Sequence, residues 1–383
     1  MKKSLFRELW LWYNGRGVIM HFRGMAPVRR TPMWNAVDKL LSNAMTNGCF
    51  PGCAISAGQR GKVFYQKTFG YLTPSQLRPV TAETRYDAGS LTQVLATMPL
   101  ALKAMESGLI SPDDPVSRFV DGVPADKREI TLENLLTHTS GLPGSFSLEH
   151  EARGAQHALK ALLAHPLESA PGSKVRQSAM GYILLGFLME KVFDMPLDDA
   201  VKRYVTGPLA MTGTGYLPSG ENIAPTRITD ENAHSGYPLD GNARFLHGIA
   251  GNAGLFTTPN DLTRFVSMLA SDGQCDGNVF LAQRSVHLAA TDRTRGMNEA
   301  WSYSLRITKR SQPYLGHLWP SDGYGLQDPS GGSLIAVNPS DGFFVTLLCN
   351  GHESPASREE NDRLRKVLLN AAYAAFQHGP EGE

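Results

Sequence analysis

The stretch Cys53–Gly70, CAISAGQRGKVFYQKTFG, decides how the fold begins. Two segments, CAISAGQ and KVFYQKTFG, flank the dipeptide Arg60-Gly61, and β-branched and aromatic residues gather in the second segment. Two such runs separated by a short turn that contains glycine are typical of a β-hairpin. The sequence therefore predicts an antiparallel pair of strands near the start of the chain.

A helix is predicted immediately before this hairpin. Thr31-Pro32 combines a capping residue with a proline in the first turn, and Asn47-Gly48 is a stop signal. Apolar side chains between these signals fall on one face of a helix: Trp34, Val37, Leu40, Leu41 and Met45.

The same pattern recurs in reverse near the C-terminus. Segments SLIAVNP and FFVTLLCN flank the turn Ser340–Gly342, which predicts a second hairpin. A final helix is predicted by an apolar stripe made of Leu364, Val367, Leu368, Ala371 and Ala375. The simplest packing joins both ends of the chain in one antiparallel sheet covered by the two terminal helices.

The segment between the two ends has mostly helical patterns and loops. We expect an α/β lobe from about residues 31–85 and 285–377, with a mainly helical lobe, about residues 86–284, inserted into it. Together they form one domain of residues 31–377 with a cleft between its lobes. Residues 1–30 are interpreted as a poorly ordered extension, or as lying upstream of the true start.

Composition excludes several classes of function. The 383 residues carry a formal net charge of +1, so electrostatics gives no reason to expect a nucleic-acid or anionic-membrane partner. No apolar run is long enough to span a bilayer, and the N-terminus is a poor signal peptide, so the cytoplasm is the expected location. Four cysteines, at positions 49, 53, 275 and 349, favour neither a metal site nor a disulfide framework, and no cofactor is predicted.

The stretch Tyr86–Met98, YDAGSLTQVLATM, presents Ser90 at the start of a helical pattern. One interpretation is a nucleophilic serine whose base lies elsewhere, because Gln93, one turn later, cannot take a proton. The competing interpretation is a helix cap, with Ser90 as the capping residue and Gln93 at the capping-box position. Pro99 should kink or shorten the helix that follows.

Several segments together resemble the penicillin-recognising serine hydrolases, a family that includes class C β-lactamases, DD-peptidases and related esterases. LENLLTHTSGLPG (residues 132–144) resembles the family signature L-L-x-H-x-S-G-L, and PGSKVRQSAMGYILLGFLMEK (residues 171–191) resembles the block around its Y-S-N motif. The resemblance covers about residues 33–375. It implies an α/β fold of the β-lactamase/DD-peptidase type, and acyl transfer through a serine as the ancestral chemistry.

The family's three catalytic motifs are all altered here. Ser90 matches the nucleophile of S-x-x-K, but Gln93 stands at the lysine position. Gln177 and Ala179 stand at the tyrosine and asparagine positions of Y-S-N. The segment YGLQDPSGGS aligns with F-G-H-T-G-x-T-G-G-S and places Leu326-Gln327-Asp328 at the K/H-T-G position, whereas a register one residue later gives Gln327-Asp328-Pro329.

The resemblance also implies a damaged oxyanion hole. The family uses two backbone N–H groups, one from the nucleophile and one from the residue after the strand triad. In the preferred register the second residue is Pro329, which has no N–H; in the other register Ser330 supplies it. Losing one such donor costs about 10²–10³ in rate. Asp328 in place of glycine adds bulk and negative charge beside the substrate position.

Other polar residues have less specific interpretations. His138 lies in the signature segment, where a packed and hydrogen-bonded histidine is expected rather than a catalytic one. His247 and His317 are possible replacement bases, with a surface position the simpler expectation. Tyr182 and Tyr324 are expected to be core or rim aromatics.

These observations predict a catalytically degenerate member of the family, a pseudoenzyme that binds a small molecule, a peptide or a protein partner through the old active-site cleft. The alternative is a working esterase, amidase or peptidase that uses Ser90 with a rebuilt base. That alternative requires a histidine or carboxylate within hydrogen-bond reach of Ser90. A third possibility is a structural protein with a filled cleft. The oligomeric state does not follow from the sequence.

Overall fold

A computed structural model describes residues 34–378 apart from 74–77, 229–232 and 352–357. The expected N-terminal extension, residues 1–30, lies outside the described residues. Both predicted hairpins are present: β1 (Gly52–Gln59) pairs with β2 (Lys62–Gly70), and β12 (Leu334–Val337) pairs with β13 (Phe343–Cys349).

The two hairpins lie side by side in one antiparallel sheet, as expected. β1 pairs with β13, with Ile55 opposite Leu347. The six-stranded sheet is completed by β10 (Arg306–Ile307) and β11 (Tyr324–Gln327), in the order β10-β11-β12-β13-β1-β2. The N-terminal hairpin and the C-terminal hairpin therefore pair with each other inside one sheet.

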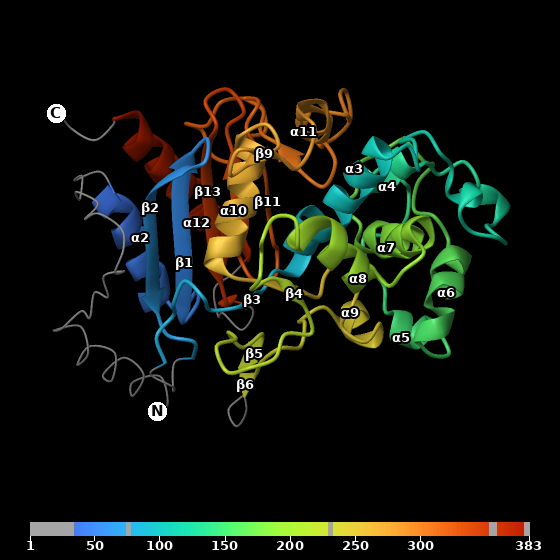
Figure 1. Cartoon of the computed structure of the whole chain (residues 1–383), viewed down its shortest axis with the longest axis horizontal. Coiled ribbons are helices and arrows are strands. Elements are labelled where there is room, and N and C mark those ends of the chain that lie inside the picture. The colour runs from blue at the N-terminus through green and yellow to red at the C-terminus, as the bar shows by residue number, and fades with distance from the viewer. Residues whose placement is uncertain (1–33, 74–77, 229–232, 352–357, 379–383) are drawn as a thin grey trace.

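Helices cover both faces of this sheet (Figure 1). On one face α2 (Trp34–Thr46) and α12 (Arg358–Gln377) pack against each other and against alternate strand residues such as Ile55 and Val345. On the other face α10 (Pro259–Ala270) packs against β1 and β13. Because both faces are covered, all seven residues of β13 are buried.

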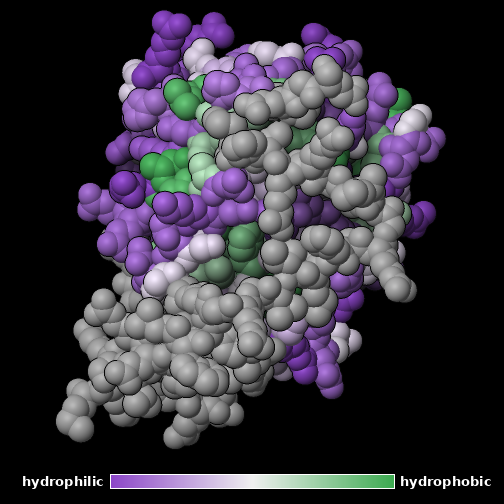
Figure 2. Space-filling view, turned by 90° about the vertical axis from the view of Figure 1, so that its left-hand side faces the viewer, coloured by the Kyte–Doolittle hydropathy of each residue, from purple (hydrophilic) through white to green (hydrophobic). Residues whose placement is uncertain are grey.

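One side of the molecule is shown in the space-filling view. The described surface visible there is mainly hydrophilic, and its hydrophobic patches are small (Figure 2). In the part of the chain that the structure describes, no helix combines the length and apolar character needed to cross a membrane.

The helical lobe is built around α7 (Ala179–Phe193), which is apolar on nearly all sides and largely buried. A helix with no polar face belongs in the interior of a lobe. It contacts α3 (Met98–Glu106), α4 (Leu132–Leu136), α6 (Ala158–Ala164) and α8 (Leu197–Val201), which continues into the π-helical turn η6 (Lys202–Thr206). The lobe also contains α5 (Leu148–Glu151) and α9 (Gly241–Phe245), whereas α11 (Gln283–Ala290) lies close to α10 and away from α7 (Figure 1).

Short strands and turns connect these helices. Strands β3 (Tyr86–Asp87), β7 (Leu255–Thr257) and β4 (Gly215–Tyr216) form a three-stranded sheet, and β5 (Arg227–Ile228) with β6 (Ala233–His234) and β8 (Gln274–Cys275) with β9 (Asn278–Val279) form two small hairpins. Single helical turns are η1 (Gly89–Leu91), η2 (Gln93–Thr97), η3 (Val116–Arg118), η4 (Ala125–Lys127) and η5 (Ala155–His157).

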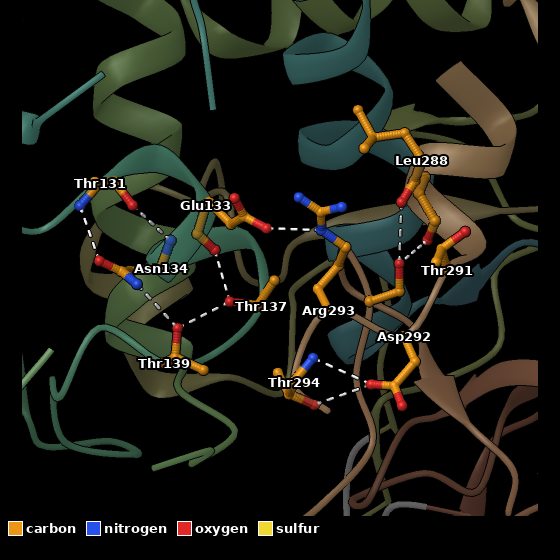
Figure 3. Close-up of polar contacts among 12 residues, drawn as sticks. Thr131, Glu133, Asn134, Thr137, Thr139, Leu288, Thr291, Asp292, Arg293 and Thr294 are labelled. Carbon is orange, nitrogen blue, oxygen red and sulfur yellow. Dashed lines mark hydrogen bonds and ion pairs between the residues drawn. The ribbon is translucent and has the colours of Figure 1, made fainter. Parts of the chain in front are cut away.

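Polar contacts join the helical lobe to the segment after α11 (Figure 3). The Arg293 guanidinium lies 2.7 Å from the Glu133 carboxylate of α4. Helix α4 begins with a capping box, in which Thr131 and Asn134 bond each other's backbone N–H groups. These contacts fix the start of the signature segment relative to the C-terminal part of the chain.

Candidate active site around Ser90

Ser90 lies in a tight turn that the neighbouring short sheet holds in place. One oxygen of Asp87 accepts the Gly89 N–H at 2.9 Å, and the other accepts the Leu239 N–H at 2.8 Å. Ala88 donates its N–H to the Leu255 carbonyl of β7. The turn η1 then passes directly into the π-helical turn η2, so Ser90 stands just before a buried helix.

The capping interpretation of Ser90 and Gln93 is wrong. No side-chain hydrogen bond caps η1, η2 or α3, and Ser90 lies inside η1 rather than before it. Gln93 is 2% exposed and its Oε1 has no hydrogen-bond partner in the described structure. Pro99 lies in the first turn of α3, and Thr97 and Met98 keep helical backbone angles where the π-helical turn η2 leads into it, so the kink or shortening expected at this proline stays a prediction.

The partner of Ser90 is Asp328, which directly follows β11. Asp328 Oδ1 accepts the Ser90 hydroxyl at 2.9 Å and the Ser90 backbone N–H at 3.0 Å. Asp328 Oδ2 accepts the Ser330 hydroxyl at 2.7 Å and the Gly331 N–H at 2.6 Å. The carboxylate is 3% exposed and has four neutral donors, and no ion pair links it to a described cation.

Gly89 is required by this arrangement. Its φ is +52°, and a Cβ there would lie 2.5 Å from Asp328 Oδ1. Only glycine combines this backbone conformation with so close an approach of the carboxylate. The geometry of Gly89, Ser90 and Asp328 is therefore one interlocked unit.

The other residues of the altered strand motif point elsewhere. Leu326 is buried in the core that β11 shares with the helical lobe. Gln327 faces the opposite side of the strand, where its Oε1 accepts a hydrogen bond from Arg365 of α12. Pro329 follows Asp328 and offers no N–H. Of the three candidate strand positions, only Asp328 contacts Ser90.

The altered Y-S-N segment begins α7. Ser178 caps the helix by accepting the Gly181 N–H at 3.0 Å and donates its hydroxyl to the Pro143 carbonyl. Gln177 and Ala179 on either side are half-buried. Neither a glutamine nor an alanine side chain can serve as the base or proton relay that the family's tyrosine provides.

His138 is the packed histidine that the sequence predicts. Its Nδ1 accepts the Ser178 N–H at 3.1 Å, and its ring lies against Tyr182 and Trp301. Burial lowers the pKa of His138 to about 3, so the ring is neutral. It therefore joins the signature segment to the start of α7 rather than acting at Ser90.

The remaining candidates also take the positions expected of them. His247 and His317 are exposed, and Tyr182 and Tyr324 are buried. No group of three or more His, Cys, Asp or Glu residues suited to a metal occurs in the described part of the chain.

The Ser90–Asp328 contact is the feature that sequence reasoning missed. The available signal is the aspartate at position 328 in place of the family's glycine, which by itself indicates only added bulk and charge. What it could not give is the direction of the side chain, because the two residues lie 238 positions apart.

Comparisons with known proteins agree with this architecture. The family model described as Beta-lactamase matches residues 37–370. The chain belongs to the beta-lactamase family. A protein of Escherichia coli O157:H7 named "Putative D-alanyl-D-alanine carboxypeptidase" is 26% identical in an alignment of 364 residues that covers 84% of this chain and 83% of that protein.

Solved structures share the fold. A class C beta-lactamase superposes with a TM-score of 0.73 at 22% identity, covering 95% of this chain and 100% of that one. EstCE1, described as a hydrolase with promiscuous acyltransferase activity, gives a TM-score of 0.72 at 19% identity, with coverage of 89% and 98%. These likenesses establish the β-lactamase/DD-peptidase-like fold.

Proposed function

We propose that this beta-lactamase family protein is a catalytically degenerate member that binds a ligand or partner instead of carrying out acyl transfer. The observation that carries the proposal is the double contact of Asp328 Oδ1 with the Ser90 hydroxyl and N–H. In the family pattern that N–H belongs to the oxyanion hole. Here a resident carboxylate occupies it.

A second candidate function is favoured by the same contact. Asp328 is a carboxylate 2.9 Å from the Ser90 hydroxyl, which meets the geometric condition for a rebuilt base. The protein would then be a serine hydrolase with a Ser–Asp pair. For that mechanism, Asp328 Oδ1 would have to accept the proton of the Ser90 hydroxyl. The same oxygen would also have to give up its hydrogen bond from the Ser90 N–H, so that this N–H can bind the substrate oxyanion.

Because these two requirements on one oxygen conflict, we favour the hypothesis that the protein is catalytically degenerate. An oxyanion hole works because its donors are free and fixed before the charge develops. If Asp328 stays in place, the Ser90 N–H is not free; if it moves away, the base is lost. The lysine and tyrosine positions supply no other base, because they hold Gln93 and Gln177.

Intact mass after incubation with a fluorophosphonate probe separates the two functions. We expect no adduct on the wild type. The hydrolase reading expects a stoichiometric adduct that Ser90→Ala abolishes and that Asp328→Asn, which keeps the shape but removes the base, abolishes too. An adduct lost in both variants would overturn the degenerate reading.

The binding role is supported by the partial exposure of three of the motif positions. Ser90, Gln177 and Ala179 are each half-buried rather than sealed. The buried negative charge of Asp328 disfavours ligands that bring a carboxylate to Ser90. Thermal-shift titration with an N-acetyl dipeptide and its C-terminal amide tests this, and stabilisation by the acid rather than the amide would contradict it.

A further inference from the structure

One cavity in the described structure lies away from Ser90. It has a volume of about 440 Å³ and is formed where α3, η6, α10 and the β8–β9 hairpin meet. This is within the range of about 300–1,000 Å³ typical of small-molecule sites. None of Ser90, Gln93 and Asp328 lines it.

Positive charge dominates the polar lining. Lys103, Arg203 and Arg264 contribute three cations, and Asp276 is the carboxylate among the lining residues. Glu106 is not a lining residue, but its carboxylate lies 3.3 Å from the Lys103 ammonium. With both acids counted, one positive charge remains in excess.

Two of these cations already have partners. Arg264 is hydrogen-bonded to Asp276 and to the Leu209 carbonyl, and Lys103 donates to the Phe280 carbonyl. Arg203 makes no ion pair with any described residue, and its guanidinium carbon lies 5.4 Å from the ring centre of Tyr204. It is the cation available to a ligand.

The rest of the lining is apolar and partly aromatic. Leu209 and Phe280 are nearly buried, and Tyr204 is half-buried. Val279 is 71% exposed at the rim. A ligand that fits this lining has an apolar or aromatic body beside these side chains and an anionic group near Arg203.

We propose that this cavity is a binding site for a small aromatic anion, such as an aryl carboxylate or sulfonate. The proposal is independent of the function proposed for Ser90. It assigns the ligand-binding capacity of the chain to a second position, at the junction between α3 of the helical lobe and α10 on the sheet.

The cavity contains its own reporter. Cys275 lines it and is half-buried, whereas the other three cysteines, at positions 49, 53 and 349, are buried. Burial raises the pKa of the Cys275 thiol, so alkylation by iodoacetamide should be followed at pH 8.5 or above. A ligand in the cavity must slow this reaction.

The test uses 8-anilinonaphthalene-1-sulfonate as the probe. We expect saturable binding of one probe molecule and a Cys275 alkylation rate at least fivefold lower at saturation, read by peptide mass. Arg203→Gln should weaken binding about tenfold, the effect of one charge-assisted hydrogen bond. Lys202→Gln is the matched control, because Lys202 is exposed on the same turn and does not line the cavity.

Three results would each overturn the proposal. They are an unchanged Cys275 alkylation rate in the presence of saturating probe, an affinity of Arg203→Gln equal to that of Lys202→Gln, and equally tight binding of the neutral analogue N-phenyl-1-naphthylamine. The Ser90→Ala variant should bind the probe as the wild type does. A negative result with the sulfonate probe therefore has no bearing on the fluorophosphonate experiment at Ser90.

Discussion

Replacing Ser90 by alanine should destabilise this protein. A catalytic nucleophile contributes little to stability, and active-site residues are often retained at a cost in stability. Ser90 instead donates its hydroxyl to the Asp328 carboxylate, which is 3% exposed. If Ser90 has become structural, its removal has a measurable free-energy cost.

The magnitude follows from the contacts of the carboxylate. A hydrogen bond to a charged group contributes about 1.5–3 kcal/mol. Three donors to Asp328 survive in Ser90→Ala: the backbone N–H of residue 90, the Ser330 hydroxyl and the Gly331 N–H. The carboxylate is therefore not left bare, and we expect a loss near the lower end, about 1.5 kcal/mol.

Chemical denaturation followed by circular dichroism measures this change in the free energy of unfolding. Ser330→Ala is the matched control, because it removes the other hydroxyl from the same carboxylate, at 2.7 Å. The double variant should lose more than the sum of the two, since only two N–H donors then remain. A Ser90→Ala variant as stable as the wild type, beside a destabilised Ser330→Ala, would refute the structural role of Ser90.

Three other perturbations have definite expected outcomes. In the wild type the free energy of unfolding should fall by about 2 kcal/mol from pH 7 to pH 5 because of His138. The pKa of this histidine is 6.5 in the unfolded state and about 3 in the folded state, so over this range only the unfolded state takes up a proton. His138→Asn, which tolerates the φ of 60° at this position, should remove most of that fall in urea titrations at the two pH values, and an equal fall would contradict it. Gly89→Ala should lower the free energy of unfolding by at least about 2 kcal/mol, because the added methyl group would clash with Asp328. Adding Asp328→Gly to the same chain should relieve this clash. A thermal melt that Gly89→Ala leaves unchanged would argue against the contact. Glu133→Gln should cost less than about 1 kcal/mol, because its ion pair with Arg293 is partly exposed, and a larger loss would show that this contact holds the lobes together.

The sheet could be predicted from the sequence because its signals are local. Each hairpin is encoded by a turn between two β-forming runs, and the terminal helices by apolar stripes. The position of α10 was not predictable in this way. Its buried residues show that it packs against another element but do not identify that element. Packing against β1 and β13 depends on how the chain returns to the sheet, which the sequence of α10 does not encode.

The candidate active site differs from the sheet, because its contacts are not local in the sequence. Every altered position was readable in the sequence, from Gln93 to Pro329. The capping interpretation failed because it weighed only neighbours in the chain. A buried carboxylate 238 positions away offers Ser90 a charge-assisted hydrogen bond, and no local capping bond competes with it.

The proposed loss of chemistry and the gain of Asp328 are physically consistent with each other. An acyl-transfer site needs hydrogen-bond donors that stay unoccupied until negative charge develops on the substrate oxygen. Here the Ser90 N–H, the Ser330 hydroxyl and the Gly331 N–H instead donate to the resident Asp328 carboxylate. A buried carboxylate is tolerable only when its hydrogen bonds are satisfied. Two donors from Ser90 and two from the turn after β11 provide four such bonds here, and none of them comes from a described cation. Once such an anion is resident, a lysine base at position 93 has no serine nucleophile to activate, and a free N–H at position 329 has no oxyanion to bind, so their absence removes nothing that the folded state uses.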